Sequence, residues 1–398
     1  MAIEYAGSRA EGARSQRTEA TEIAGVLRRV DWLLLLGVGA LVAYGLWAIA
    51  GITRTEVRHD PTYYLTRQGA YVAVGVVGLV VALLVDPDAV RRRWRGIYGG
   101  TVALMLIVFA AGPITRGSRR WLDLGFFKFQ PSEFGKLLFV LAIGGFLAER
   151  SRRINEPRTT LIAVGLAALP IGLVFLQPDL GTALVYAAAL FALLFVCGAR
   201  WLHVALLGVA AVLAAVAVLW VLPVAGVHVL RPYQVHRLTN FFTPSQDPRG
   251  ATYNLRQSMT AIGAGGWHGR GVYGSTQTNL GLLPEAPTDF AFAALSEQRG
   301  FLGSTVLLLL YLLVVWRGLR VVTLAPDLYG AVVAGGIVFA LLFQIYVNVG
   351  MTMSIAPITG IPLPFVSVGG SSMIANLVAV GVLLSIAARG RAAADRRR

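Results

Sequence analysis

The chain has 398 residues, of which 56% are hydrophobic and only 14% charged, and its mean hydropathy is +0.67. This composition excludes an ordinary soluble domain and predicts an all-α polytopic membrane protein. The formal net charge is +15, but the basic residues form short clusters instead of one patch, which argues against nucleic-acid binding.

The chain opens with a polar stretch, residues 1–27, which contains no apolar core or cleavage pattern. We therefore expect a disordered cytoplasmic tail and no cleaved signal peptide. A single membrane domain is expected over residues 28–390, followed by a basic cytoplasmic tail at 391–398. Apolar stretches of spanning length predict about ten transmembrane helices in that domain. They lie near 31–52, 69–86, 97–113, 133–148, 160–177, 181–199, 201–230, 301–319, 329–350 and 370–388.

The basic residues are concentrated in every second loop, that is, in the loops on one side of the membrane. With the N-terminus inside, most of the 35 Lys and Arg fall on the cytoplasmic side. The positive-inside rule then predicts a multi-pass protein of the plasma membrane with both termini in the cytoplasm. Arg119, Arg120 and Arg256 are exceptions because they lie in loops predicted to be external. Such cations would suit binding of anionic phosphates, although attraction to anionic lipid headgroups would also explain them.

The longest polar segment, residues 231–292, separates the seventh and eighth predicted helices and would form a large extracytoplasmic loop. Within it, residues 251–263 are expected to form a short helix. The loop ends by bringing two carboxylates, Glu285 and Asp289, back to the membrane boundary. Ionisable groups at that depth are costly unless they are used, so the segment predicts chemistry at the outer surface on a lipid-borne substrate.

A second irregular segment, residues 355–372, links the last two predicted helices. Its prolines and glycines prevent a helix, yet it is too apolar for a free loop. Because irregular backbone at membrane depth needs protein or water around it, a re-entrant segment lining a cavity is expected.

Three positions carry candidate chemistry. Pro131 should begin a helix whose i, i+3 pair Glu133 and Lys136 shares one face, either as a functional pair or as a structural ion pair. Asp179 would be a functional carboxylate or the N-cap of the next helix. Asp289, half-desolvated and close to a second carboxylate, is expected to have a raised pKa suited to a general base, the alternative being a polar capping role. No His/Cys spacing typical of zinc and no Ser-His-Asp pattern occurs.

Taken together, these motifs resemble the SEDS family (shape, elongation, division, sporulation) of peptidoglycan glycosyltransferases, over roughly residues 28–390. The matching segments are 119–125, 130–136, 177–182, Gln257-Ser258, 261–263, 283–285, 288–290, 359–365 and 369–372. The opening 28–32 and the stretch from Gln177 resemble the elongation branch, RodA, more than the division branch, FtsW. Pro287 departs from the family, which usually has His there.

The resemblance implies that the substrate is lipid II and the product a lengthened β-1,4 glycan on undecaprenyl pyrophosphate, made for cell-wall elongation and rod shape. One inverting displacement needs one base, for which Asp289 is the candidate, with Glu285 and Thr288 beside it. Arg119, Arg120, Lys136 or Arg256 would hold phosphate, which a divalent cation such as Mg or Mn could assist. A lipid II flippase and a division-type polymerase remain alternatives.

The resemblance also implies a partner, a single-pass class B penicillin-binding protein that cross-links the glycan. Within the 329–350 helix, Gly330, Ala334, Gly335 and Gly336 form a small-residue patch on which the partner helix could dock. Internal packing would explain the same patch.

Overall fold

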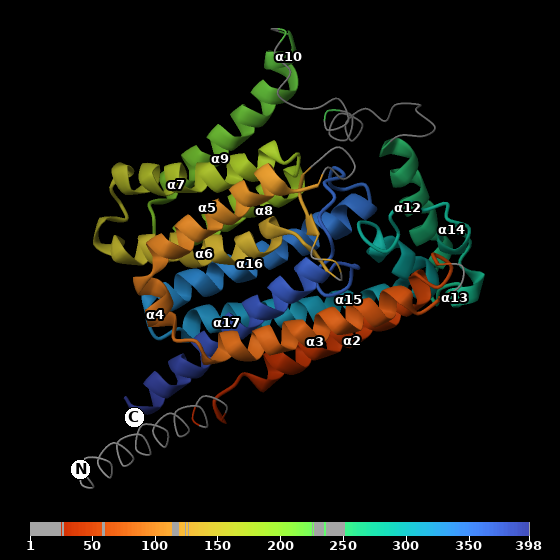
Figure 1. The fold of residues 1–398 in the computed structure, drawn as a ribbon, viewed down its shortest axis with the longest axis horizontal. Helices are drawn as coiled ribbons and strands as arrows, with labels where there is room; N and C mark the ends of the chain where they lie inside the picture. Colours follow the sequence, from red (N-terminus) through yellow and green to blue (C-terminus); the bar gives the residue numbers. More distant parts are fainter. Residues whose placement is uncertain are drawn as a thin grey trace.

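The computed structural model describes residues 28–57, 60–113, 119–123, 127–224 and 251–397, together with Gly25, Gly125, Gly226 and Val235. The expected tail 1–27, except Gly25, and most of 225–250 lie outside the described residues. Figure 1 shows a bundle of long helices with a group of short ones at one end. In chain order the elements are α2 (Trp32–Ile52), α3 (Tyr63–Leu84), α4 (Pro87–Arg92), α5 (Trp94–Ala111), β1 (Leu122–Asp123), β2 (Lys128–Phe129), α6 (Pro131–Glu149), η1 (Ser151–Arg153), α7 (Pro157–Leu176), α8 (Leu180–Val196), α9 (Trp201–Val216), the π-helical η2 (Ala217–Val221), α10 (Leu222–Val224), α12 (Ala251–Gly265), α13 (Gly271–Gly274), α14 (Thr276–Asn279), α15 (Ala291–Leu324), α16 (Leu328–Thr352) and α17 (Gly370–Asp395).

All ten predicted helices are present among the described residues. By length and composition nine are able to cross a membrane, and α8, at 17 residues, is shorter. Several begin where the sequence provides a start signal. Pro131 and Pro157 occupy the first turns of α6 and α7, and the Asp179 side chain accepts a hydrogen bond from the backbone N–H of Thr182 at the start of α8 (3.1 Å). The capping alternative for Asp179 is therefore confirmed.

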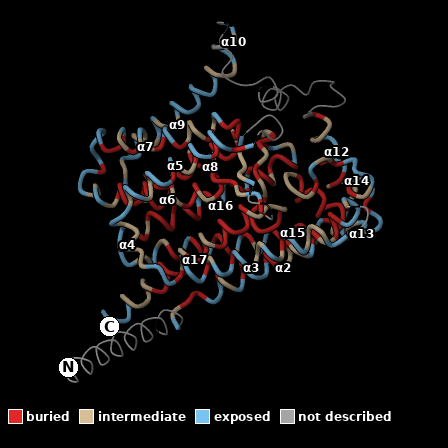
Figure 2. Tube along the Cα trace, in the orientation of Figure 1, coloured by how far each residue is buried: buried red, intermediate tan, exposed pale blue. Residues whose placement is uncertain are grey.

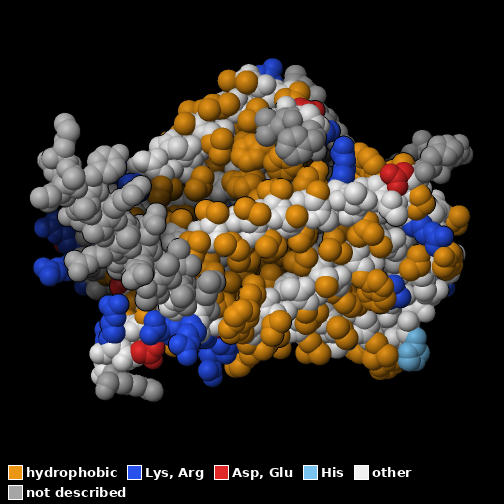
Figure 3. Space-filling view, turned by 60° about the horizontal axis from the view of Figure 1, so that its bottom comes forward, with side chains coloured by type: hydrophobic (Ala, Val, Ile, Leu, Met, Phe, Trp, Pro, Cys, Tyr) orange, Lys and Arg blue, Asp and Glu red, His pale blue; other side chains and the backbone are white. Residues whose placement is uncertain are grey.

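The chain alternates between two ends of the bundle. One, here called the termini end, carries α4 and the ends of the described chain at residues 28 and 397; the other, the site end, carries α12 to α14 (Figure 1). The interior is buried and the sides are exposed (Figure 2). Those sides form a broad hydrophobic band, with Lys and Arg gathered mainly towards the ends (Figure 3). This distribution is typical of a protein surrounded by lipid.

The last helix runs further than expected. A basic tail was predicted from residue 391, but α17 continues to Asp395 because polar contacts hold its final turns. Arg391 donates to the Asp31 carboxylate at the start of α2 (2.9 Å), as does Arg317 of α15 (2.5 Å). Asp31 is 1% exposed, and its two cationic partners balance the cost of burying its charge.

Helix α9 differs from the other long helices because none of its residues is buried. It extends away from the bundle together with α10 (Figure 1).

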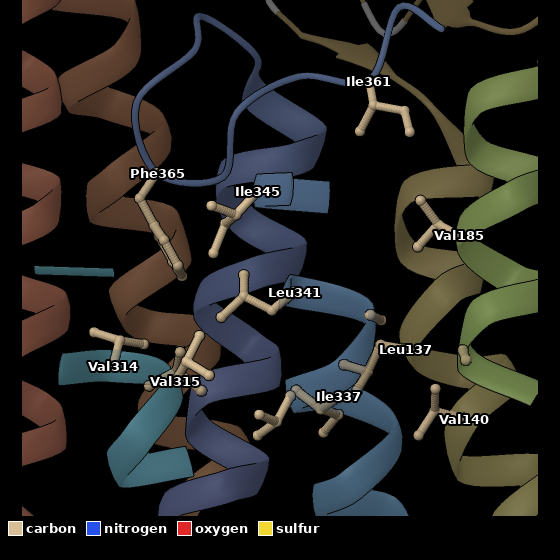
Figure 4. Close-up of a cluster of buried hydrophobic side chains, with 14 of the residues drawn as sticks. Leu137, Val140, Val185, Val314, Val315, Ile337, Leu341, Ile345, Ile361 and Phe365 are labelled. Carbon is tan, nitrogen blue, oxygen red and sulfur yellow. The ribbon is translucent and has the colours of Figure 1, made fainter. Parts of the chain in front are cut away.

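The segment between α16 and α17 is irregular and mostly buried, as expected for residues 355–372. Ile361 and Phe365, both about 2% exposed, point down from it into the helix bundle (Figure 4). Its backbone approaches α2 so closely that a Cβ added at Gly45 would lie 2.3 Å from the Phe365 carbonyl oxygen. The segment therefore forms a packed cover over the interior at the site end.

The described part of the large loop forms α12 to α14, and α12 agrees with the predicted short helix. The segment that follows α12 packs against α15 at a kink in that helix. The kink is at Gly300, whose φ is +67° and ψ is −164°. The freed N–H of Phe301 donates to the Gly266 carbonyl (2.8 Å), and Arg270 N–H donates to the Glu297 carbonyl (2.9 Å). A Cβ at Gly300 would lie 2.3 Å from Gly269 N, so glycine is needed at this close approach.

Candidate active site

Asp289 lies at the site end, immediately before Phe290, the N-cap of α15, and is half-buried. The backbone around it is held from two sides. Asn348 of α16 donates to the Asp289 carbonyl (3.0 Å), and Ser367 Oγ donates to the Thr288 carbonyl (2.5 Å). Val368 N–H donates to the Pro287 carbonyl (2.8 Å). The carboxylate is thus mounted on a segment that α16 and the 353–369 cover hold in place.

Glu285 and Thr288 join Asp289 on this segment, as predicted. Thr288 Oγ1 donates to the exposed Glu285 carboxylate (3.0 Å), and the backbone at Glu285 is left-handed, with φ +53°. Positive φ is rare for a non-glycine residue and persists where surrounding contacts impose it. The N–H groups of Thr288 and Phe290 donate to the Glu285 carbonyl (3.1 and 3.2 Å), which closes a compact turn.

Glu133 and Lys136 form the predicted pair near the start of α6. Lys136 Nζ donates to Glu133 Oε2 (2.9 Å) and to Gln344 Oε1 of α16 (2.8 Å). The two charged residues are only 3% and 9% exposed, so each charge depends on its partner. They line a small cavity of about 40 Å³, whose other lining residues are mostly apolar side chains of α6, α15, α16 and α17.

Asp179 and Arg120 meet beside this pair. Besides capping α8, Asp179 accepts from Gln130 Nε2 (3.2 Å) and lies 3.9 Å from an Arg120 nitrogen. Arg120 is half-buried and donates to the carbonyls of Gln177 (2.8 Å) and Pro178. Its guanidinium therefore stabilises the junction between α7 and α8.

The remaining predicted residues occupy the rim of the site end or its interior. Arg119 and Arg256 are exposed, the first with only long bonds of 3.4 Å to two carbonyls of α5. Gln257 is half-buried on α12. Ser258 is fully buried and donates to the Thr352 carbonyl (2.8 Å), so it attaches α12 to the end of α16.

Sequence analysis missed Gln344 and Asn348, which connect these groups. They are four residues apart on α16 and so share one face of the helix. Gln344 contacts Lys136, whereas Asn348 holds the backbone of Asp289 and that of Ile361 (2.7 Å). Two amides four residues apart in an otherwise apolar helix were the signal that could have revealed them.

Glu297 lies in the first turns of α15. It is fully buried and accepts from the N–H groups of Gln277 (2.8 Å) and Thr278 (3.0 Å) and from Thr278 Oγ1 (2.7 Å). It therefore joins α14 to α15 and supports the turn that leads to Asp289.

The prediction that the small-residue patch on α16 faces outward as a docking surface is wrong. Gly330, Ala334, Gly335 and Gly336 are all buried, and Cβ atoms added at Gly335 and Gly336 would meet Val196 and Leu193 of α8 at 2.6 and 2.8 Å. These small residues allow α16 to approach its neighbours inside the bundle, which was the alternative explanation.

Comparison with known proteins agrees with this arrangement. The family FTSW_RODA_SPOVE, described as cell cycle protein, matches residues 28–392. The chain belongs to this family. It is 36% identical to the peptidoglycan glycosyltransferase MrdB of Escherichia coli K12, over 90% of this chain and 93% of that protein. It is 38% identical to a probable peptidoglycan glycosyltransferase FtsW of Thioalkalivibrio sulfidiphilus, over 90% of each. A chain from the solved structure titled "Structural coordination of polymerization and crosslinking by a peptidoglycan synthase complex" superposes with a TM-score of 0.77 at 30% identity, covering 91% of this chain and 98% of that one.

Proposed function

We propose that this family member is a peptidoglycan glycosyltransferase that polymerises lipid II into β-1,4-linked glycan, with Asp289 as the general base. Two relatives that are 36% and 38% identical over the aligned residues are named a peptidoglycan glycosyltransferase and a probable peptidoglycan glycosyltransferase. One observation supports this role for Asp289. It is a half-buried carboxylate on a segment whose backbone is fixed by hydrogen bonds from Asn348 and Ser367. A base must be held within hydrogen-bond reach of the proton that it removes, and this mounting supports that task.

The reaction requires one displacement at the donor sugar. The acceptor hydroxyl oxygen forms a bond to the donor anomeric carbon while the bond from that carbon to the pyrophosphate oxygen breaks, and Asp289 takes the hydroxyl proton. The α-linked donor thereby becomes a β-linked product. Negative charge develops on the leaving pyrophosphate, so nearby cations stabilise the transition state. Arg119 and Arg256 suit this role because both are exposed, and the bonds of Arg119 to two carbonyls of α5 are long, at 3.4 Å. Arg120 and Lys136 are held by shorter bonds to protein groups.

In the part of the chain that the structure describes, no group of three His, Cys, Asp or Glu side chains gathers into a site built from protein ligands alone. Mg²⁺ beside a pyrophosphate needs only one or two carboxylates, because the substrate supplies the other oxygen ligands. Asp289 and Glu285 are the carboxylates of this segment that would bind such an ion.

The flippase alternative drew on the buried Glu133–Lys136 pair. A transport route needs a path through the bundle wide enough for the headgroup. The cavity beside the pair, about 40 Å³, has room for only about three water molecules. A disaccharide-pentapeptide is far larger, which favours polymerisation at the site end.

We also propose that the site end faces outward, that both termini are cytoplasmic, and that the chain acts in elongation with a class B penicillin-binding protein. Arginines at the termini end support the orientation. The segments 28–32 and 177–182 support the elongation role, and the likeness to a synthase complex supports the partner. Co-purification with the elongation and division transpeptidases of the same bacterium tests the branch, because preferential capture of the division enzyme would contradict our assignment.

Purified protein incubated with lipid II, with and without the transpeptidase, tests the activity. Replacing Asp289 by Asn keeps the shape but removes the proton acceptor, so polymerisation should fall by about 10²- to 10⁴-fold. Glu285→Gln is the matched control, because Glu285 is an exposed carboxylate four residues earlier on the same segment. Its polymerisation rate should fall far less than that of Asp289→Asn. Near-normal synthesis by folded Asp289→Asn protein would exclude the general-base role.

A further inference from the structure

An apolar groove of about 320 Å³ lies in the half of the bundle nearest the termini end. Its walls come from α3, α4, α6, α16 and α17, and Ser385 and Tyr329 are the residues with a hydroxyl among its lining. Helix α3 packs along α17 while α5 packs along α6, so the groove lies between these two helix pairs. Its volume is within the usual range for ligand pockets, and its walls suit a hydrocarbon chain.

The turn at the termini end of the groove is strongly basic. Val85, Pro87 and Val90 line the groove, and Arg91, Arg92 and Arg93 follow directly on α4 and its C-cap. Two acidic residues of this turn are already neutralised, since Asp88 pairs with Arg91 (3.2 Å) and Asp86 with Arg389 of α17 (3.3 Å).

Arg92 and Arg93 are exposed and make no ion pair within the described part of the chain. Arg95, one turn further on, is occupied by Glu149 (3.1 Å). The turn therefore offers two positive charges without an ion pair in the described chain, two and three residues after Val90 of the groove wall. That combination matches an amphiphile with an anionic head and an acyl tail.

We propose that this groove binds one anionic phospholipid of the leaflet at the termini end, with an acyl chain between α3 and α6 and its phosphate at Arg92 and Arg93. Charge complementarity at the mouth selects this occupant over a zwitterionic lipid. Basic pockets between transmembrane helices commonly hold anionic headgroups in this manner. The site is separate from glycosyl transfer and does not depend on the proposed function.

The basic mouth of the groove lies far from Asp289, although the α6 wall of the groove begins at Leu137, the residue after Lys136. Gly78, its first lining residue on α3, is 15 residues beyond Tyr63 at the site end, about 22 Å along the helix. A substrate whose phosphates lie at Arg119 or Arg256 would have its head at the opposite end from Arg92 and Arg93. A bound phospholipid would instead fill the space between the two helix pairs and hold α3 against the bundle.

The test measures binding of phosphatidylglycerol and phosphatidylcholine to the purified full chain by native mass spectrometry. We expect one tightly held phosphatidylglycerol, preferred at least tenfold over phosphatidylcholine. The double variant Arg92→Gln/Arg93→Gln should weaken phosphatidylglycerol binding by about 10- to 30-fold, given about 1 kcal/mol for each arginine near an anionic lipid. Arg152→Gln/Arg158→Gln is the matched control, because both residues are exposed at η1 and the start of α7, outside the groove lining.

Two further variants test the groove itself. Leu138→Trp should fill the groove from α6. If that variant fails to fold, Val85→Trp should fill the groove from its mouth, where the side chain is more exposed. Either should reduce retention of phosphatidylglycerol. Equal binding of both lipids, equal losses in the control, or unchanged retention in both tryptophan variants would overturn the proposal. So would displacement of the lipid by undecaprenyl phosphate, since the groove would then hold the substrate's tail.

Discussion

The link between α16 and Asp289 can be tested through Asn348. Its amide donates to two carbonyls, those of Asp289 (3.0 Å) and Ile361 (2.7 Å), and the residue is 0% exposed. Among the described residues, its Oδ1 has no hydrogen-bond partner. Rotating the amide would turn that oxygen towards both carbonyls, so the observed orientation is the one that satisfies them.

Replacing Asn348 by Leu keeps a branched side chain of similar shape but removes both N–H donors; the larger volume of Leu is matched in the control variant below. A buried carbonyl left without a donor costs about 1–3 kcal/mol, so the two together cost about 2–6 kcal/mol unless the backbone relaxes. Relaxation would move the Asp289 segment, and displacement of a reacting group by about 1 Å can cost about 10²-fold in rate. We therefore expect a lower melting temperature and about 100-fold slower polymerisation.

The assay compares initial rates of glycan synthesis from lipid II with thermal unfolding of the same preparations. Asn376→Leu is the matched control because Asn376, also buried, makes a single bond to Ser372 one turn earlier on its own helix (3.2 Å). It should remain within about threefold of the unmodified rate. A folded Asn348→Leu protein that polymerises at the unmodified rate, or an equal loss in the control, would refute the role of Asn348 in positioning Asp289.

Two further changes address packing and charge. Glu133→Gln and Lys136→Met should each destabilise the protein by about 3–5 kcal/mol, because either leaves a buried charge without its partner. Their effects should not add in a double-mutant cycle followed by thermal unfolding and polymerisation, and a coupling below about 0.5 kcal/mol would indicate independent roles. Gly45→Ala should lower the melting temperature because its Cβ would lie 2.3 Å from the Phe365 carbonyl oxygen. Gly39→Ala on the same helix meets nothing within 4 Å and should be neutral or stabilising by up to about 1 kcal/mol, so equal losses in the two variants would contradict the packing argument.

The sequence by itself determined the features that depend on composition and local spacing. Hydropathy placed all ten helices, but some ends differ, most of all for α15, which begins at Ala291, ten residues before the predicted start at 301. Pro131 and Asp179 marked two helix starts, and the i, i+3 spacing brought Glu133 and Lys136 together. Such interactions span one turn of helix, so the chain's own geometry specifies them.

Only the tertiary structure decided which faces of the helices meet. Asp31 pairs with arginines 286 and 360 residues away, and Asn348 reaches Asp289 across 59 residues. The same holds for the α16 glycines, which could have faced a partner but pack against α8.

The physical reason is that lipid and protein interior are both apolar. A spanning helix is therefore hydrophobic on every side, and its periodicity does not mark the buried face. Helices α3 and α16 have similar hydropathies, 1.8 and 2.1, yet 22% of the first and 72% of the second is buried within their apolar windows. Close packing of small and large side chains, which hydropathy does not encode, determined that difference.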